Sequence, residues 1–132
     1  TGRLPGSDRM AAARSLAADT GAVVLLKGPT TVVAAPDGRV LLTAAGDARL
    51  ATAGTGDVLA GIIGAFLARG AGPLEAAATA AHVHGRLATA PGLKELPPTG
   101  VVAGDLSARL VSVLTDLSID ATGLADQTKG VH

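Results

Sequence analysis

The sequence contains no cysteine, tryptophan or tyrosine, and Phe66 is the only phenylalanine. Without cysteine the chain can form neither a disulfide framework nor a thiolate metal site or nucleophile, which fits a cytoplasmic protein. Without large aromatic rings it lacks the platforms on which bases and sugars stack. Any ligand must therefore be held by backbone groups, small side chains and a few charges.

An excess of charge is also missing, because 11 basic residues balance 11 acidic residues. A neutral chain without a basic run is not expected to bind nucleic acid through its phosphates. The longest apolar stretch, residues 58–68, is too short to cross a bilayer, so we expect no membrane segment. With 132 residues, 48% of them hydrophobic, the chain has the size and apolar content of one folded α/β domain.

The first part of the chain predicts one helix followed by three strands. A helix begins at the capping residues Ser7 and Asp8 and ends at Gly21. Its predicted apolar face consists of Met10, Ala13, Leu16 and Ala17. Residues 22–26 are a continuous aliphatic run, which is typical of a strand buried on both faces. Residues 31–35 and 39–43 predict two short strands around a tight turn.

Three helices are predicted to follow, over residues 57–69, 73–90 and 104–117. The last carries an apolar stripe made of Leu106, Leu110, Val113, Leu114 and Leu117. Residues 118–132 lack this periodicity, and we expect them to form a flexible tail. The helix from residue 57 is apolar almost all round, so we expect it to be buried on more than one side. Three strands cannot cover it, which indicates that the chain is part of a larger α/β domain.

A glycine-rich turn before the first of these helices is the most informative segment. Gly54 and Gly56 let successive N–H groups point one way, and the helix start adds positive potential, so the turn suits a phosphoryl group. Asp57 lies beside that position and would repel a phosphate, which favours a role as a base for an attacking hydroxyl. The alternative is that Asp57 only caps the helix and the glycines only turn the chain.

A second candidate segment starts at Lys27, where the first predicted strand ends. Ligands of open α/β sheets gather at the carboxyl ends of strands, where Lys27 could pair with phosphates and Thr30 and Thr31 could add hydrogen bonds. The alternative is a surface lysine at a strand end. No Walker A loop and no dinucleotide fingerprint is present.

Two further sets of polar residues favour structural roles. His82 and His84 are two apart on a predicted helix, so their side chains diverge by roughly 200° and cannot share a metal ion there. A packed or hydrogen-bonded His84 is the favoured interpretation. Asp105 is interpreted as a cap of the last helix rather than a catalytic acid.

These motifs together resemble the ribokinase-like family of ADP- or ATP-dependent NAD(P)H-hydrate dehydratases. The resemblance runs from Val23 to Asp105 and rests most on residues 50–63, with further matches at residues 24–31, 36–38, 84–85 and 103–106. It implies a three-layer αβα fold, present here as the C-terminal part of the domain over residues 1–117, with about three strands and four helices. Ala53 and Gly104 stand where many members have Gly and Ser.

The resemblance also implies an activity, a lyase that repairs nicotinamide cofactors. ADP or ATP would phosphorylate the ring hydroxyl of the S epimer of NADH or NADPH hydrate, and loss of phosphate would restore the double bond. Asp57 would contact the hydrate and act as the base. The implied nucleotide-binding residues are Lys27, Gly28, Pro29, Thr30, Thr31 and Gly56, and the implied anion hole is Ala53, Gly54, Thr55 and Gly56. Mg²⁺ with unassigned ligands and a homotetramer are expected as well.

Two other functions remain open from the sequence. A ribokinase-like kinase for a vitamin precursor would share the anion hole and the aspartate, but would release a stable phosphate ester. A non-catalytic module would bind nucleotide, or only assemble with copies of itself, and would be indifferent to Asp57→Asn.

Overall fold

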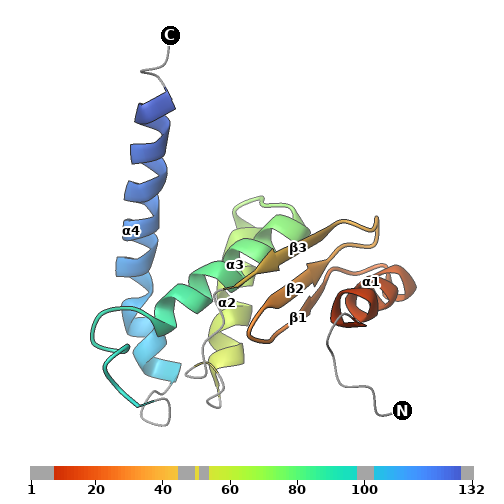
Figure 1. Ribbon diagram of the computed structural model, residues 1–132, viewed down its shortest axis with the longest axis horizontal. Coiled ribbons are helices and arrows are strands. Elements are labelled where there is room, and N and C mark those ends of the chain that lie inside the picture. Colours follow the sequence, from red (N-terminus) through yellow and green to blue (C-terminus); the bar gives the residue numbers. More distant parts are fainter. Residues whose placement is uncertain (1–7, 45–49, 51–53, 98–102, 129–132) are drawn as a thin grey trace.

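The computed structural model describes residues 8–44, 50, 54–97 and 103–128, with side chains up to Ser118. Its elements follow the predicted order, one helix, three strands and three helices (Figure 1). They are α1 (Asp8–Thr20), β1 (Val24–Leu26), β2 (Thr31–Ala34), β3 (Val40–Thr43), α2 (Thr55–Ala68), α3 (Pro73–Ala88) and α4 (Ala103–Thr128). Pro73 begins α3, where its missing N–H removes no helical hydrogen bond.

The three strands form an antiparallel sheet in the order β1-β2-β3. The predicted turn at 36–38 joins β2 to β3, and Gly38 adopts a φ of 93° that favours glycine. The strand that is buried on both faces is β2, whereas β1 is only half-buried. The prediction for residues 22–26 was wrong in this respect, because β1 pairs with β2 alone among the described strands.

Alternate residues of β2 face two different helices. Val32 and Ala34 pack against Ala13 and Ala17 of α1. Val33, the intervening residue, packs against α3 in a second cluster. The sheet therefore lies between α1 and α3, and this confirms the predicted three-layer α/β arrangement.

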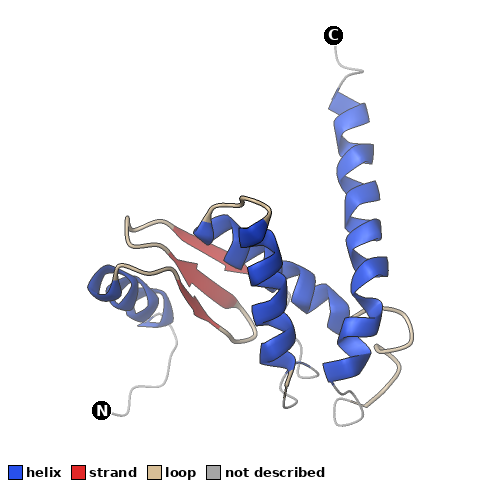
Figure 2. Ribbon diagram, turned by 180° about the vertical axis from the view of Figure 1, so that it is seen from behind, coloured by secondary structure: helices blue, strands red, loops and turns tan. Residues whose placement is uncertain are grey.

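A third core joins α2, α3 and α4 beside the sheet, on the side away from α1 (Figure 2). Its buried members include Leu59, Ile62, Val83, Leu87, Leu106 and Val113. The apolar stripe predicted for the last helix packs on this core, which confirms that prediction. This cluster fixes the position of the N-terminus of α2 relative to α3.

Some predicted faces and ends differ from the structure. Met10 and Leu16 are exposed, because only Ala13 and Ala17 of α1 face the sheet. In α2 only Thr55, Leu59 and Ile62 are buried, so the helix is covered on one side within the described chain. The predicted end of the last helix near Leu117 was wrong, since α4 continues to Thr128. None of the helices in the described ranges has the length and hydropathy needed to traverse a membrane.

Candidate functional site

The glycine-rich turn predicted before the helix lies at the start of α2. Gly54 takes the cap position with φ 86° and ψ −13°, a left-handed conformation that favours glycine. A Cβ at this position would lie 3.2 Å from Cβ of Ala103, so a side chain here would also crowd the start of α4. The first turn of a helix carries N–H groups without intrahelical acceptors, and these suit an anion.

Asp57 lies in the first turn of α2 and is exposed. Its backbone N–H donates to the carbonyl of Gly54 at 3.1 Å. Gly54 occupies the cap position, without a side-chain cap hydrogen bond, so the alternative in which Asp57 is the cap was wrong. Its carboxylate is available for chemistry at the helix start.

A largely buried hydrogen-bond network holds this turn in place. Oγ1 of Thr55 donates to the carbonyl of Leu50 at 2.7 Å. Nζ of Lys27 donates to the same carbonyl at 3.4 Å. Nε2 of His84 lies 2.9 Å from the carbonyl oxygen of Thr55. These hydrogen bonds link four parts of the chain, which are the end of β1, residue 50, α2 and α3.

His84 is buried, and its environment lowers the pKa of the imidazole. Removal from water is the main cause, and the positive charge of Lys27 acts in the same direction. The hydrogen bond to Thr55 acts in the opposite direction. The imidazole is therefore favoured in its neutral form.

The second candidate segment, the loop at residues 27–30 between β1 and β2, is held by Arg9 of α1. The Arg9 guanidinium donates to the carbonyls of Lys27 at 2.7 Å, Thr30 at 3.1 Å and Leu26 at 3.2 Å. Arg9 was not among the site residues predicted from the sequence. Its contacts span 17 to 21 residues, and no local pattern indicates them.

The predicted nucleotide-binding residues fall into different environments. Lys27, Pro29 and Thr30 are exposed on the loop, and Gly28 lies directly beneath the Arg9 guanidinium. Thr31 is buried in β2, opposite Thr43 of β3. Lys27 is the member that reaches the α2 network, through Leu50. Among the described strands the pairing is antiparallel, so the loop joins β1 to β2 as a hairpin.

Of the predicted anion hole, Thr55 is buried and Gly54 and Gly56 are exposed, and Ala53 lies outside the described residues. Gly54 and Gly56 therefore present their backbone at the surface beside Asp57. Thr55 points inward and anchors the turn. The hydrogen bonds of Thr55 therefore lie inside, beneath the two exposed glycines.

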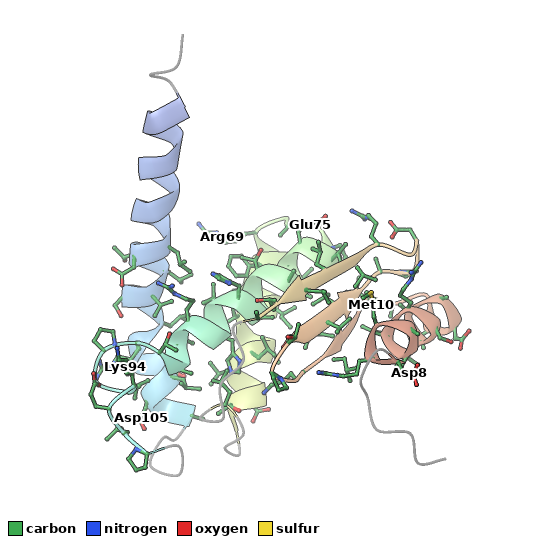
Figure 3. The ribbon with its side chains drawn as sticks, viewed as in Figure 1. Asp8, Met10, Arg69, Glu75, Lys94 and Asp105 are labelled. Carbon is green, nitrogen blue, oxygen red and sulfur yellow. The ribbon has the colours of Figure 1, made fainter. Side chains whose placement is uncertain are left out.

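His82, His84 and Asp105 are not grouped as metal ligands in the structure. His82 is exposed and His84 is buried, which confirms the divergence predicted from their spacing. The sequence suggested that Asp105 caps the last helix. The helix already begins at Ala103, so Asp105 lies in its first turn and not at its cap. Figure 3 shows Asp105 at the base of this helix. Within the described ranges, no three carboxylate or imidazole groups cluster as metal ligands.

Much of this chain is similar in sequence to known proteins. A sequence model of the NAD(P)H-hydrate dehydratase family matches residues 2–111. The bifunctional NAD(P)H-hydrate repair enzyme of Mycobacterium leprae is 53% identical over 87 residues, which are 66% of this chain and 18% of that protein. The ADP-dependent (S)-NAD(P)H-hydrate dehydratase of Neisseria meningitidis is 47% identical over 104 residues, which are 79% of this chain and 34% of that protein.

The fold has a counterpart among solved structures. The ADP/ATP-dependent NAD(P)H-hydrate dehydratase from Bacillus subtilis, co-crystallised with ATP and Mg²⁺, superposes with a TM-score of 0.76 at 34% sequence identity. The match covers 83% of this chain and 39% of that chain. The chain therefore spans between about a fifth and two-fifths of the length of these relatives.

Proposed function

Because the chain belongs to the NAD(P)H-hydrate dehydratase family, we propose that it is the nucleotide-binding part of an enzyme that repairs damaged nicotinamide cofactors. In this reaction ADP or ATP phosphorylates the ring hydroxyl of the S epimer of NADH or NADPH hydrate. The phosphate then leaves, and a carbon–carbon double bond is restored. The enzyme is a carbon–oxygen lyase, and this activity is proposed for the whole protein, of which the chain is one part.

The observation that carries the proposal is the first turn of α2. Gly54 and Gly56 expose the backbone at the helix start, and Asp57 stands exposed in the same turn. A carboxylate gains nothing by binding a phosphoryl group directly, since the two charges repel. It is well placed to accept the proton of the hydroxyl that attacks this group.

The remaining roles follow from position. We assign the adenine nucleotide to residues 27–31 and Gly56. We assign to the backbone N–H groups of residues 53–56 the role of stabilising the charge that develops on the transferred phosphoryl group. Thr31 is buried, so it offers the nucleotide little surface.

Mg²⁺ belongs to the proposal as a partner of the nucleotide. When bound, it would neutralise charge on the phosphates. Mg²⁺ in such sites is held by one or two carboxylates, substrate phosphates and water, so it requires no dedicated protein cage. We assign it no ligand here, and no step above passes through it. A homotetramer and a cytoplasmic location complete the proposal.

The test is an assay with NADPH hydrate, Mg²⁺ and either ADP or ATP, following the absorbance of the reduced nicotinamide. The assay uses the whole protein that contains this chain. We expect the absorbance to return with the wild-type sequence and with Asp19→Asn, a matched change on the exposed surface of α1. With Asp57→Asn it should not return. A stable phosphate ester of a vitamin precursor would indicate the kinase instead. ADP binding without turnover would indicate a nucleotide-binding module.

A further inference from the structure

His84 of α3 contacts the backbone carbonyl of Thr55 in the anion-binding turn. Its side chain is 2% exposed, and Nε2 lies 2.9 Å from the carbonyl oxygen of Thr55. A carbonyl oxygen only accepts hydrogen bonds, so Nε2 must carry the proton in the neutral ring. This contact joins residues 29 positions apart in the sequence.

Thr55 is the buried residue of an otherwise exposed turn. Gly54, Gly56 and Asp57 face solvent, and Thr55 is 2% exposed. Its hydroxyl is fixed by the carbonyl of Leu50 at 2.7 Å, and its own carbonyl by His84. Two polar atoms of one residue, held by two different parts of the chain, leave its peptide planes little freedom. The orientation of the neighbouring N–H groups depends on those planes.

We propose that His84 is a positioning residue, which holds the carbonyl of Thr55 so that the backbone N–H groups of the turn point outward to a phosphoryl group. The chemical meaning of this role rests on the function proposed above. The role itself concerns the geometry of the turn and can be tested without turnover. Preorganised donors of this kind cost no rearrangement when charge develops on a reacting group.

Two substitutions of nearly equal size separate positioning from packing. Glutamine and methionine have the same chain length, and glutamine places an amide donor near the position of Nε2. If His84 only fills space, His84→Gln and His84→Met will behave alike, or methionine will be tolerated better in a buried site. If His84 acts through its hydrogen bond, only glutamine will preserve the turn.

The experiment combines NMR with binding of ADP. Nitrogen-15 shifts of the imidazoles report the tautomer, with exposed His82 as the internal reference. We expect the Nε2–H form for His84. We expect hydrogen exchange of the amides at residues 54–57 to rise roughly tenfold in His84→Met, and to stay within about threefold of wild type in His84→Gln. Affinity for ADP should follow the same order.

Several outcomes would overturn the inference. One is the Nδ1–H tautomer in the wild-type chain, which is measured even if His84→Met fails to fold. Another is equal exchange at residues 54–57 in the two folded variants. Loss of turnover in the wild-type assay with the turn and its tautomer as expected would contradict the proposed function and leave the positioning role supported.

Discussion

The loop at residues 27–30 and the first turn of α2 are both short, glycine-containing segments, but different parts of the molecule hold them in different ways. Arg9 holds the loop from α1 with a charged side chain, through carbonyls that are mostly exposed. His84 and the Leu50 carbonyl hold the α2 turn through Thr55, in contacts that are buried.

The difference in burial decides what each segment can do. When an exposed hydrogen bond breaks, water replaces the lost partner at a small free-energy cost. When a buried bond breaks, the polar atom is left without water or partner, so the cost is greater. The loop can therefore adjust to a ligand, whereas the α2 turn is held in one geometry before any ligand arrives.

Under the proposed function, this contrast fits two different tasks in phosphoryl transfer. Binding of a nucleotide tolerates adjustment, because its phosphates and ribose can be met by several loop conformations. Stabilising charge on the transferred group demands donors that are already in place. We therefore expect changes in the α2 turn to affect stability and rate, and changes in the loop to affect nucleotide affinity.

The largest effect is expected from Thr55→Val, which removes the buried hydroxyl and keeps the shape of the side chain. The Leu50 carbonyl then loses its 2.7 Å donor, and the free energy of unfolding should fall by about 1–3 kcal/mol. Urea denaturation measures the change. The matched control is Thr89→Val, whose exposed hydroxyl donates to the carbonyl of Arg86. Equal losses in the two variants would show that burial does not distinguish the α2 turn.

The second prediction concerns the dependence of stability on pH. The folded chain lowers the pKa of His84 below its ordinary value of 6.5, mainly by burial and also through Lys27. Between the lowered pKa and 6.5 the unfolded chain binds more protons, so the wild-type chain should lose stability as the pH falls through this window. Above about pH 7 no loss is expected.

His84→Gln removes this titration and keeps a hydrogen-bond donor. Its free energy of unfolding should fall less than that of the wild-type chain between pH 7 and pH 5, because the remaining titratable groups are the same in both proteins. Urea denaturation at a series of pH values measures both slopes. Parallel slopes would mean that His84 does not titrate differently in the folded and unfolded chains.

The contrast between the two segments also explains which features could be predicted from the sequence. The α2 turn was predicted from Gly54, Gly56 and Asp57, because the chemistry of a helix start is local. The order of elements and the apolar stripe of α4 were predicted for the same reason. The burial of β2 instead of β1 was not, since both are aliphatic and their position in the sheet depends on pairing.

Contacts between residues far apart in the sequence could not be predicted from local patterns. Arg9 is an ordinary surface residue in the pattern of α1, and only the folded chain brings it to the loop. His84 was expected to be packed or hydrogen-bonded, but its partner, the carbonyl of Thr55, has no side-chain signal in the sequence. The apolar character of α2 predicted burial on more than one side, whereas the described chain covers one side only.

A smaller effect is expected from Arg9→Ala, which removes the three donors to the loop. Because the carbonyls are mostly exposed, water can replace the guanidinium, and the free energy of unfolding should fall by only about 1 kcal/mol. The amides of Gly28 and Thr30 should exchange faster, and ADP should bind more weakly. Arg14→Ala, on the same helix, is the matched control. A loss as large as that of Thr55→Val would remove the distinction between the two segments.

The smallest and most specific effect is expected from Gly28→Ala. A Cβ at this position would collide with the Arg9 guanidinium, which is the far end of a flexible side chain and can move away. The substitution should therefore reproduce the faster exchange of Arg9→Ala with little loss of stability. In the Arg9→Ala background it should have almost no further effect, because the group that it displaces is already gone. A double-mutant cycle by hydrogen exchange measures this coupling, and additive effects would show that Arg9 does not hold the loop through its contact at Gly28.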